Sequence, residues 1–268
     1  MPLTHVNNVD LYYELHGPED ADVIVLSNGI FMSTASWGYQ IATLKQHFRV
    51  LVYDCRGMWQ SEHPAGPYSM EQHADDLAAL LQGLGIEKAH IAGISYGGEI
   101  SMVFAVKYPK MTRSLIVSSS VSHIEPLLHA IGESWQNALA RQDGGLVFSV
   151  TLPYNFSEQW LQANQAILPN TRARYDQLDC VSGLALMNAF MEFNFTDQLH
   201  HIIAPTLVLV GEQDILKTPH YAHIIADNIP GAELVEIPDA GHAVCLEKPG
   251  AFNSALLGFL LKHSEVAA

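Results

Sequence analysis

The stretch Gly93-Ile94-Ser95-Tyr96-Gly97-Gly98 decides the fold, because it joins two segments with different hydrophobic patterns. Residues 89–94 form a short apolar run typical of a buried strand, and the residues after Tyr96 follow a helical pattern that ends near Pro109. The stretch fits G-x-S-x-G, in which glycines allow a sharp strand-to-helix turn that exposes the serine hydroxyl. The sequence therefore predicts that Ser95 is a nucleophile at the end of a strand.

Strand and helix signals alternate along much of the chain. Further strands are expected at 23–26, 50–53, 114–118, 205–210 and 233–237, and helices around Trp37, at 69–83, at 220–228 and at 252–260. The unbroken apolar strands are typical of a parallel sheet covered by helices on both faces. Asn7-Asn8 predicts an antiparallel hairpin at the start, because asparagine tolerates positive φ. The expected fold class is α/β, with a mostly parallel sheet of about eight strands.

This alternation stops in the middle of the chain. Residues 123–201 carry helical signals and no convincing strand, so we expect 1–122 and 202–268 to form one core and 123–201 to be a helical insertion after the sixth strand. The insertion is rich in aromatic residues and methionine, namely Trp135, Phe148, Tyr154, Phe156, Trp160, Met187, Phe190, Met191, Phe193 and Phe195. Such side chains favour an apolar substrate where they face a site, although the insertion also needs an apolar core of its own.

A serine hydroxyl needs a base to remove its proton and an acid to orient that base. Asp214 follows the strand expected at 205–210, and His242 follows the strand expected at 233–237. Both therefore stand at the carboxyl ends of strands, where catalytic groups gather in parallel sheets. Glu212 is a rival acid in the same loop, and we prefer Asp214 because the outermost residue of such a loop reaches the histidine more easily.

An acyl-transfer site also needs donors for the oxyanion that forms on the substrate. One is the backbone N–H of Tyr96, directly after the serine. The other is expected from the loop that follows residues 23–26, where Gly29 lets the backbone approach the substrate and Ile30 donates its N–H. The same glycine also suits an ordinary turn into the helix around Trp37.

The composition excludes several kinds of partner. The chain has 268 residues, 49% of them hydrophobic, and 13 basic against 28 acidic residues give a formal charge of −15. This charge repels nucleic acids and anionic lipids. No apolar run approaches the roughly 20 residues of a membrane helix and the start has no signal-peptide pattern, so we expect a cytoplasmic protein, with a homodimer left open. The three cysteines, Cys55, Cys180 and Cys245, are expected to be reduced and buried.

The remaining histidines do not form a metal-binding motif. Two neighbours, His200-His201, and a helical pair, His220 with His223, are candidates by spacing alone. Neither pair has a cysteine partner or an H-E-x-x-H pattern beside it. We therefore expect no metal and no other cofactor.

The whole chain, from the N-terminal hairpin to the last helix, resembles the α/β-hydrolase superfamily. Residues 11–28, with L-Y-Y-E-L-H-G-P followed by V-I-V-L-S-N, and the segment P-T-L-V-L-V-G-E-Q-D at 205–214 are similar to 3-oxoadipate enol-lactonases and related esterases. The segment N-G-I-F-M-S-T-A-S-W at 28–37 is more similar to 3-hydroxyacyl transferases that use acyl carrier protein or coenzyme A thioesters. The two likenesses imply one fold and different reactions.

Both likenesses imply the same site. Ser95 would be the nucleophile, His242 the base and Asp214 the residue that orients it, with the N–H groups of Tyr96 and Ile30 as the oxyanion hole. The order Ser, Asp, His along the chain is the order of this superfamily. The resemblance also implies that the insertion at 123–201 forms a helical cap over the site.

Some motif positions depart from the family pattern. The loop Asp54-Cys55-Arg56-Gly57-Met58-Trp59-Gln60-Ser61 stands where the family has D-x-R-G-H-G-x-S, so Met58 replaces a histidine and Trp59 a glycine. The Trp59 indole either lines the mouth of the site or fills a gap beneath the cap. Asn28-Gly29 replaces the usual His-Gly, as in several enol-lactonases. Ser95 stands where haloalkane dehalogenases and epoxide hydrolases have aspartate, which disfavours both chemistries.

The expected function is hydrolysis of a carboxylic ester, lactone or thioester through an acyl-serine intermediate. The residues expected to bind a small acyl substrate with an apolar part are Phe31, Trp59, Trp135, Phe156 and Trp160. The cations that either meet an anionic substrate group or lie in solvent are Arg141, Arg172, Arg174 and Lys217. Two alternatives stay open: an acyltransferase that acts on 3-hydroxyacyl thioesters with the same three residues, and a non-catalytic ligand-binding relative.

Overall fold

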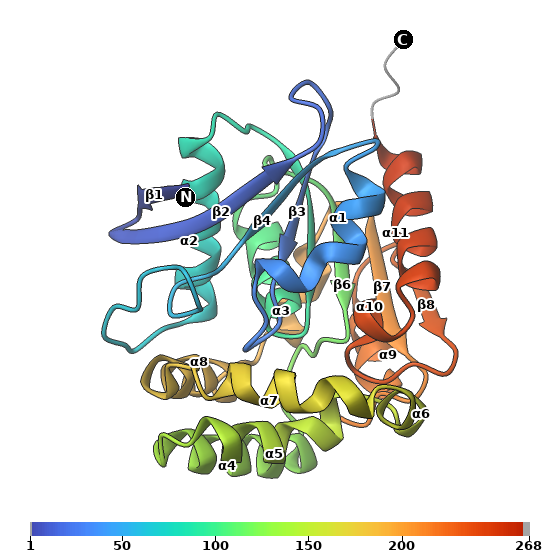
Figure 1. Ribbon diagram of the computed structural model, residues 1–268. Coiled ribbons are helices and arrows are strands. Elements are labelled where there is room, and N and C mark those ends of the chain that lie inside the picture. The colour runs from blue at the N-terminus through green and yellow to red at the C-terminus, as the bar shows by residue number, and fades with distance from the viewer. Residues whose placement is uncertain (1, 265–268) are drawn as a thin grey trace.

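The computed structural model describes residues 2–264, in which a twisted central sheet carries helices on both faces and a further helical layer at one end (Figure 1). The strands are β1 (Leu3–Val6), β2 (Val9–His16), β3 (Val23–Ser27), β4 (Arg49–Tyr53), β5 (Ala89–Ile94), β6 (Thr112–Ser118), β7 (Thr206–Gly211) and β8 (Glu233–Ile237). Their order in the sheet is β1-β2-β4-β3-β5-β6-β7-β8. The expected mostly parallel sheet of eight strands is confirmed.

The antiparallel part of the sheet is confined to its start. β1 pairs with β2, and β2 pairs with β4, in antiparallel register, whereas the pairs from β4 to β8 are parallel. The turn between β1 and β2 places Asn7 at φ 46° and Asn8 at φ 59°, as the expected hairpin requires. Every residue of β3, β5 and β7 is buried, because helices cover both faces of the sheet there.

The helices on the two faces enclose two separate apolar cores. One face is covered by α2 (Met70–Gly83), α3 (Tyr96–Lys107) and α9 (Pro219–Asn228), and the other by η1 (Thr34–Trp37), α1 (Gly38–Leu44), α10 (Val244–Glu247) and α11 (Pro249–His263). The hydroxyl of Ser69 accepts the Gln72 N–H at 3.1 Å and so caps the start of α2.

The residues between β6 and β7 form the layer at the lower end of the sheet in Figure 1. It contains α4 (Pro126–Ala140), α5 (Gly144–Asn155), α6 (Glu158–Ala163), η2 (Gln165–Ile167), α7 (Leu168–Tyr175), α8 (Cys180–Met191) and η3 (Thr196–His201). Within the described residues, the β pairing in this segment is limited to one isolated bridge between His123 and Asn194. We refer to α4–α8 below as the helical layer.

Candidate active site

Ser95 lies on a strained turn between β5 and α3. Its backbone has φ 54° and ψ −120°, a region that residues other than glycine rarely occupy. The neighbouring glycines are required by close backbone contact. A Cβ on Gly93 would lie 2.1 Å from the Gly97 carbonyl oxygen, and a Cβ on Gly97 would lie 2.1 Å from the Ser27 carbonyl oxygen. The G-x-S-x-G pattern therefore reflects the tight packing of the turn that presents Ser95.

The loops after β7 and β8 bring Asp214 and His242 to this serine. His242 Nε2 lies 3.0 Å from Ser95 Oγ, and His242 Nδ1 lies 2.8 Å from Asp214 Oδ2. All three residues are buried. In this arrangement the imidazole can take the hydroxyl proton while the carboxylate holds the ring in one orientation.

The backbone fixes Asp214 in place. Its Oδ1 accepts the N–H groups of Leu216 at 2.9 Å and Lys217 at 2.8 Å, which leaves Oδ2 for the histidine. Glu212, the rival acid, is exposed, and its carboxylate faces a backbone N–H of a neighbouring loop. The structure therefore brings Asp214, and not Glu212, to His242.

Two backbone donors stand beside the serine hydroxyl. The loop after β3 passes close to it, since a Cβ on Gly29 would lie 3.4 Å from the Ser95 Cβ. Within residues 2–264, the N–H groups of Ile30 and Tyr96 have no hydrogen-bond partner. Both are therefore available to an oxygen atom of a ligand.

A buried polar network holds the loop that carries Ile30. Asn28 donates from Nδ2 to Asp54 Oδ1 at 2.9 Å and accepts the Trp37 indole N–H at 2.7 Å. Asp54 also accepts the Thr34 N–H at 2.9 Å, and burial raises the pKa of the Asp54 carboxyl to about 6. The sequence showed Asn28 only as a departure from the family pattern; its role in holding the loop depends on partners that are distant in the chain.

A second buried network lies behind the site. Lys217 Nζ lies 2.8 and 3.0 Å from the two carboxylate oxygens of Glu99, which also accepts the Val121 N–H. Burial lowers the pKa of Lys217 and raises the pKa of Glu99, while their attraction opposes both shifts. Lys217 is only 3% exposed, so of its two alternatives the solvent-exposed one is wrong, and its charge is already paired with Glu99. Glu99 was not selected from the sequence. The signal that could have found it is that Glu99 is the one acidic residue in the largely apolar helix α3.

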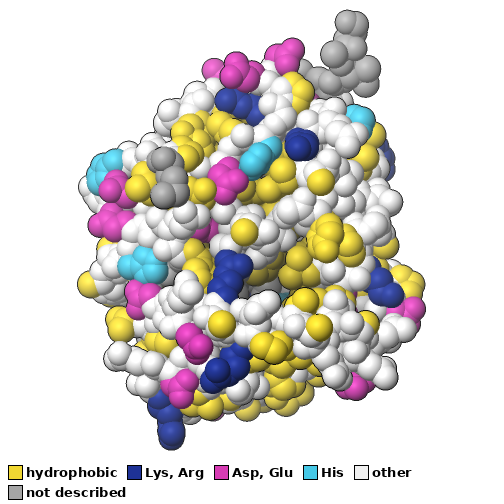
Figure 2. All heavy atoms as spheres, in the orientation of Figure 1, with side chains coloured by type: hydrophobic (Ala, Val, Ile, Leu, Met, Phe, Trp, Pro, Cys, Tyr) yellow, Lys and Arg dark blue, Asp and Glu magenta, His cyan; other side chains and the backbone are white. Residues whose placement is uncertain are grey.

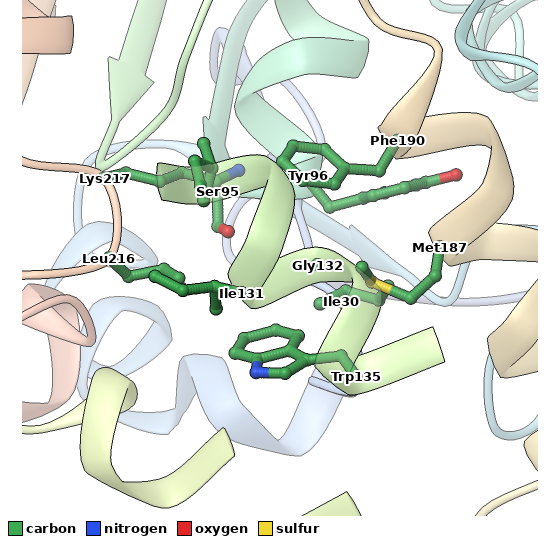
Figure 3. Close-up of a pocket in the computed structure, with 11 residues that line it drawn as sticks. Ile30, Ser95, Tyr96, Ile131, Gly132, Trp135, Met187, Phe190, Leu216 and Lys217 are labelled. Carbon is green, nitrogen blue, oxygen red and sulfur yellow. The ribbon is translucent and has the colours of Figure 1, made fainter. Parts of the chain in front are cut away.

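Two cavities meet at Ser95. The smaller has a free volume of about 20 Å³ and lies against α4 and α8. Figure 3 shows Trp135 and Ile131 projecting from α4, and Met187 and Phe190 projecting from α8. The larger has a free volume of about 340 Å³ and includes His242 in its wall. The residues that the sequence assigned to substrate binding all line this larger cavity, namely Phe31, Trp59, Trp135, Phe156 and Trp160.

Sequence reasoning missed most of the face that α4 contributes to the wall of the smaller cavity. Leu128, Ile131, Gly132 and Trp135 on α4 all line it. Their spacing of i, i+3, i+4 and i+7 is the stripe of one helical face, and this was the signal that could have found them. Of these four, the sequence pointed only to Trp135, as one of the aromatic residues of the insertion.

Trp59 lies in the wall of the larger cavity. Its indole N–H donates to the Phe31 carbonyl at 3.0 Å, and the guanidinium of Arg174 lies 4.4 Å from its ring centroid. Arg174 also donates to the Ser33 hydroxyl and lines the same cavity. The other candidate cations, Arg141 and Arg172, are exposed and line neither cavity.

Other candidate features carry no site. In the part of the chain that the structure describes, no group of three or more His, Cys, Asp or Glu side chains is placed to hold a metal ion. His220 and His223 instead face Glu125 and Glu236 at 3.1 and 2.8 Å.

The three cysteines are buried and unpaired, and no helix in residues 2–264 is long and apolar enough to cross a membrane. Lysine and arginine side chains are scattered over the face in Figure 2.

Comparisons with known proteins agree with the fold. The family described as alpha/beta hydrolase fold matches residues 22–249. A provisionally assigned carbamate hydrolase, RutD, from Pantoea ananatis (strain LMG 20103) is 30% identical over 262 residues, which cover 95% of this chain and 94% of the relative.

Solved structures give the same result. The α/β-hydrolase enzyme MGS-M2, from a Medee basin deep-sea metagenome library, is 30% identical with a TM-score of 0.92, and the match covers 100% of this chain and 99% of that one. The enol-lactonase from Burkholderia xenovorans LB400 is 28% identical with a TM-score of 0.88, over 97% of this chain and 100% of the other. The expected resemblance is confirmed, and this chain belongs to the α/β-hydrolase family.

Proposed function

We propose that this α/β hydrolase cleaves a carboxylic ester, lactone or thioester through an acyl-Ser95 intermediate. The observation that carries the proposal is the hydrogen-bonded series from Asp214 through His242 to Ser95, beside the N–H groups of Ile30 and Tyr96. A hydroxyl, a base, an orienting acid and two oxyanion donors are the parts that acyl transfer through serine needs.

The first half of the reaction forms the acyl-enzyme. Ser95 Oγ attacks the substrate carbonyl carbon while His242 Nε2 takes the hydroxyl proton. The carbonyl electrons move to its oxygen, which the N–H groups of Ile30 and Tyr96 stabilise. As the tetrahedral species collapses, the bond to the leaving group breaks, and protonated His242 gives that proton to the departing oxygen or sulfur. Asp214 stabilises the imidazolium throughout.

The second half repeats these steps with water. His242 removes a proton from a water molecule, whose oxygen attacks the acyl carbon. The second tetrahedral species collapses to the free acid, and the proton returns to Ser95 Oγ. An acyltransferase would use an alcohol or thiol in place of this water, and the first half would be unchanged.

The cavity favours a substrate with an apolar part. One relative is named for carbamate and one solved structure for an enol-lactone, and both kinds of bond are cleaved at a carbonyl carbon. The larger cavity has a free volume of about 340 Å³ and a wall that includes Phe156, Trp160 and Phe148. Pockets of this size and composition are typical of ligands considerably larger than a carbamate ion. We therefore place an ester or lactone ahead of a carbamate.

The test is the Ser95→Ala variant of the full chain, assayed on p-nitrophenyl esters, lactones and acyl-CoA thioesters. We expect kcat to fall by about 10³- to 10⁶-fold and labelling by a fluorophosphonate to disappear. The melting temperature should stay within a few degrees of the parent, which shows that the variant is folded. Full activity and full labelling of Ser95→Ala would overturn the mechanism.

Product analysis separates the alternatives. If an added alcohol becomes acylated in preference to water, the chain is an acyltransferase. If ligands bind tightly without turnover and Ser95→Ala binds them equally well, the chain is a non-catalytic relative.

A further inference from the structure

Ser95 lies where two cavities of very different size join. The smaller, with a free volume of about 20 Å³, and the larger, with about 340 Å³, share Ile30, Ser95 and Trp135 in their walls. Figure 3 shows the Ser95 hydroxyl directed toward the smaller cavity, while the phenol oxygen of Tyr96 points away from the serine. A substrate carbonyl bound at Ser95 therefore has one of its two substituents in each cavity.

The position of His242 decides which substituent enters which cavity. In the acylation step the leaving group must receive its proton from His242. The imidazole forms part of the wall of the larger cavity and not of the smaller one. The leaving group therefore belongs in the larger cavity, and the acyl group belongs in the smaller one.

The smaller cavity admits only a short acyl group. Its free volume of about 20 Å³ corresponds to roughly one or two water-sized groups. The helices that bound it are packed closely, because a Cβ on Gly132 would lie 2.3 Å from Met191 Sδ. Beyond Ser95, the wall is apolar apart from Lys217, whose charge is paired with Glu99 at 2.8 Å. It suits a short alkyl chain and offers no free cation to a carboxylate on the acyl side.

We propose that the substrates are esters of a short, unbranched acyl group, acetyl or propionyl, with a large apolar alcohol, and that Met187 and Leu128 set the limit on acyl length. This proposal rests on the proposed serine hydrolase function and deepens it. The two side chains come from α8 and α4, and both line the smaller cavity.

The first experiment varies the two ends of the substrate separately. With p-nitrophenol as the fixed leaving group, we expect kcat/KM to fall at least tenfold from acetate to hexanoate, because each methylene beyond the cavity limit must displace packed side chains. With acetate as the fixed acyl group, the ethyl, phenyl and 2-naphthyl esters should all be cleaved, the largest most efficiently. A kcat/KM that is constant or rises with acyl length would place the acyl chain in the larger cavity and overturn the proposal.

Truncation of the cavity walls provides the second experiment. Met187→Ala, and separately Leu128→Ala, should each raise the hexanoate-to-acetate ratio of kcat/KM by about tenfold. Leu152→Ala, a matched apolar truncation in the larger cavity, should leave this ratio within twofold. If Leu152→Ala shifts the acyl ratio and neither of the other variants does, the assignment of the cavities is wrong.

The outcomes distinguish this proposal from the proposed function. If the protein cleaves esters, is labelled at Ser95 by a fluorophosphonate and prefers long acyl chains, only the cavity assignment fails. If no ester, lactone or thioester is cleaved and Ser95 is not labelled, the hydrolase mechanism itself fails, and the assignment fails with it.

Discussion

The two sides of the candidate active site consist of different kinds of side chain. On the side of the sheet, buried polar groups are joined in fixed networks, in which Asp214 accepts two backbone N–H groups and Asn28 joins Asp54 to Trp37. On the side of the helical layer, the wall consists mainly of apolar side chains such as Ile131 and Phe190. Proton transfer needs atoms held within a few tenths of an ångström, whereas an apolar wall can be reshaped by substitution. From this difference we expect the reaction to depend on the sheet side and the choice of substrate to depend on the layer.

The largest expected effect is on the rate when Asp214 is replaced. Asp214→Asn keeps the shape of the side chain but no longer favours the histidine tautomer that accepts the Ser95 proton, so we expect kcat to fall by about 10³- to 10⁴-fold. Steady-state kinetics on p-nitrophenyl acetate measures this. The matched control, Glu212→Gln two residues away, should retain activity within twofold. A larger loss in Glu212→Gln than in Asp214→Asn would show that the wrong carboxylate has been assigned.

Most of the fold, and the three residues that the structure brings together at Ser95, could be predicted from the sequence because their signals are local. The turn at Ser95 and the runs of apolar strand residues each depend on neighbours in the chain, and the structure confirms the expected strands. The networks could not be predicted, because Glu99 and Lys217 meet across more than a hundred residues of chain. The size of the smaller cavity depends on how α4 packs on α8, which no local pattern encodes.

The next largest effect is expected on stability, when the buried ion pair between Lys217 and Glu99 is broken. Lys217→Met leaves the buried Glu99 carboxylate without its partner, so we expect the free energy of unfolding to fall by about 3–5 kcal/mol in urea titrations. The double variant Lys217→Met/Glu99→Gln should recover most of this loss. Lys262→Met removes an exposed pair with Glu233 and should cost less than about 1 kcal/mol. If Lys217→Met and Lys262→Met lowered the free energy of unfolding equally, the buried pair would be no more important to stability than the exposed one, and the contrast would be wrong.

Acid should destabilise the sheet side through a histidine that is buried without charge. Burial, helped by the charge of Arg56, lowers the pKa of His73 to about 3, so the unfolded chain binds this proton between about pH 6.5 and 3 and the folded chain does not. Stability is therefore lost as the pH falls, by about 2 kcal/mol from pH 7 to pH 5 for this group. His73→Gln should flatten the pH dependence of unfolding by that amount, if the variant folds. His129→Gln, at an exposed position on α4, is the matched control for the loss of a histidine side chain.

The smallest effect is expected on stability, from the contact that Arg174 of the helical layer makes with Trp59 on the sheet side. Arg174 on α7 stacks over the Trp59 ring and donates to the Ser33 hydroxyl at the edge of the larger cavity. Because this contact is partly exposed, Arg174→Ala should lower the free energy of unfolding by only about 0.5–1 kcal/mol. Arg172→Ala, whose side chain faces solvent and Asp176, should change it by less than about 0.5 kcal/mol.

A double-mutant cycle decides whether this contact couples the two sides. If Arg174 acts through the indole, Arg174→Ala and Trp59→Leu together should cost measurably less than the sum of their separate effects in urea titrations. Additive losses would mean that the stacking contributes nothing. The layer would then be held to the sheet side near Trp59 by its other contacts, and Arg174 would remain a cation in the cavity wall with no part in stability.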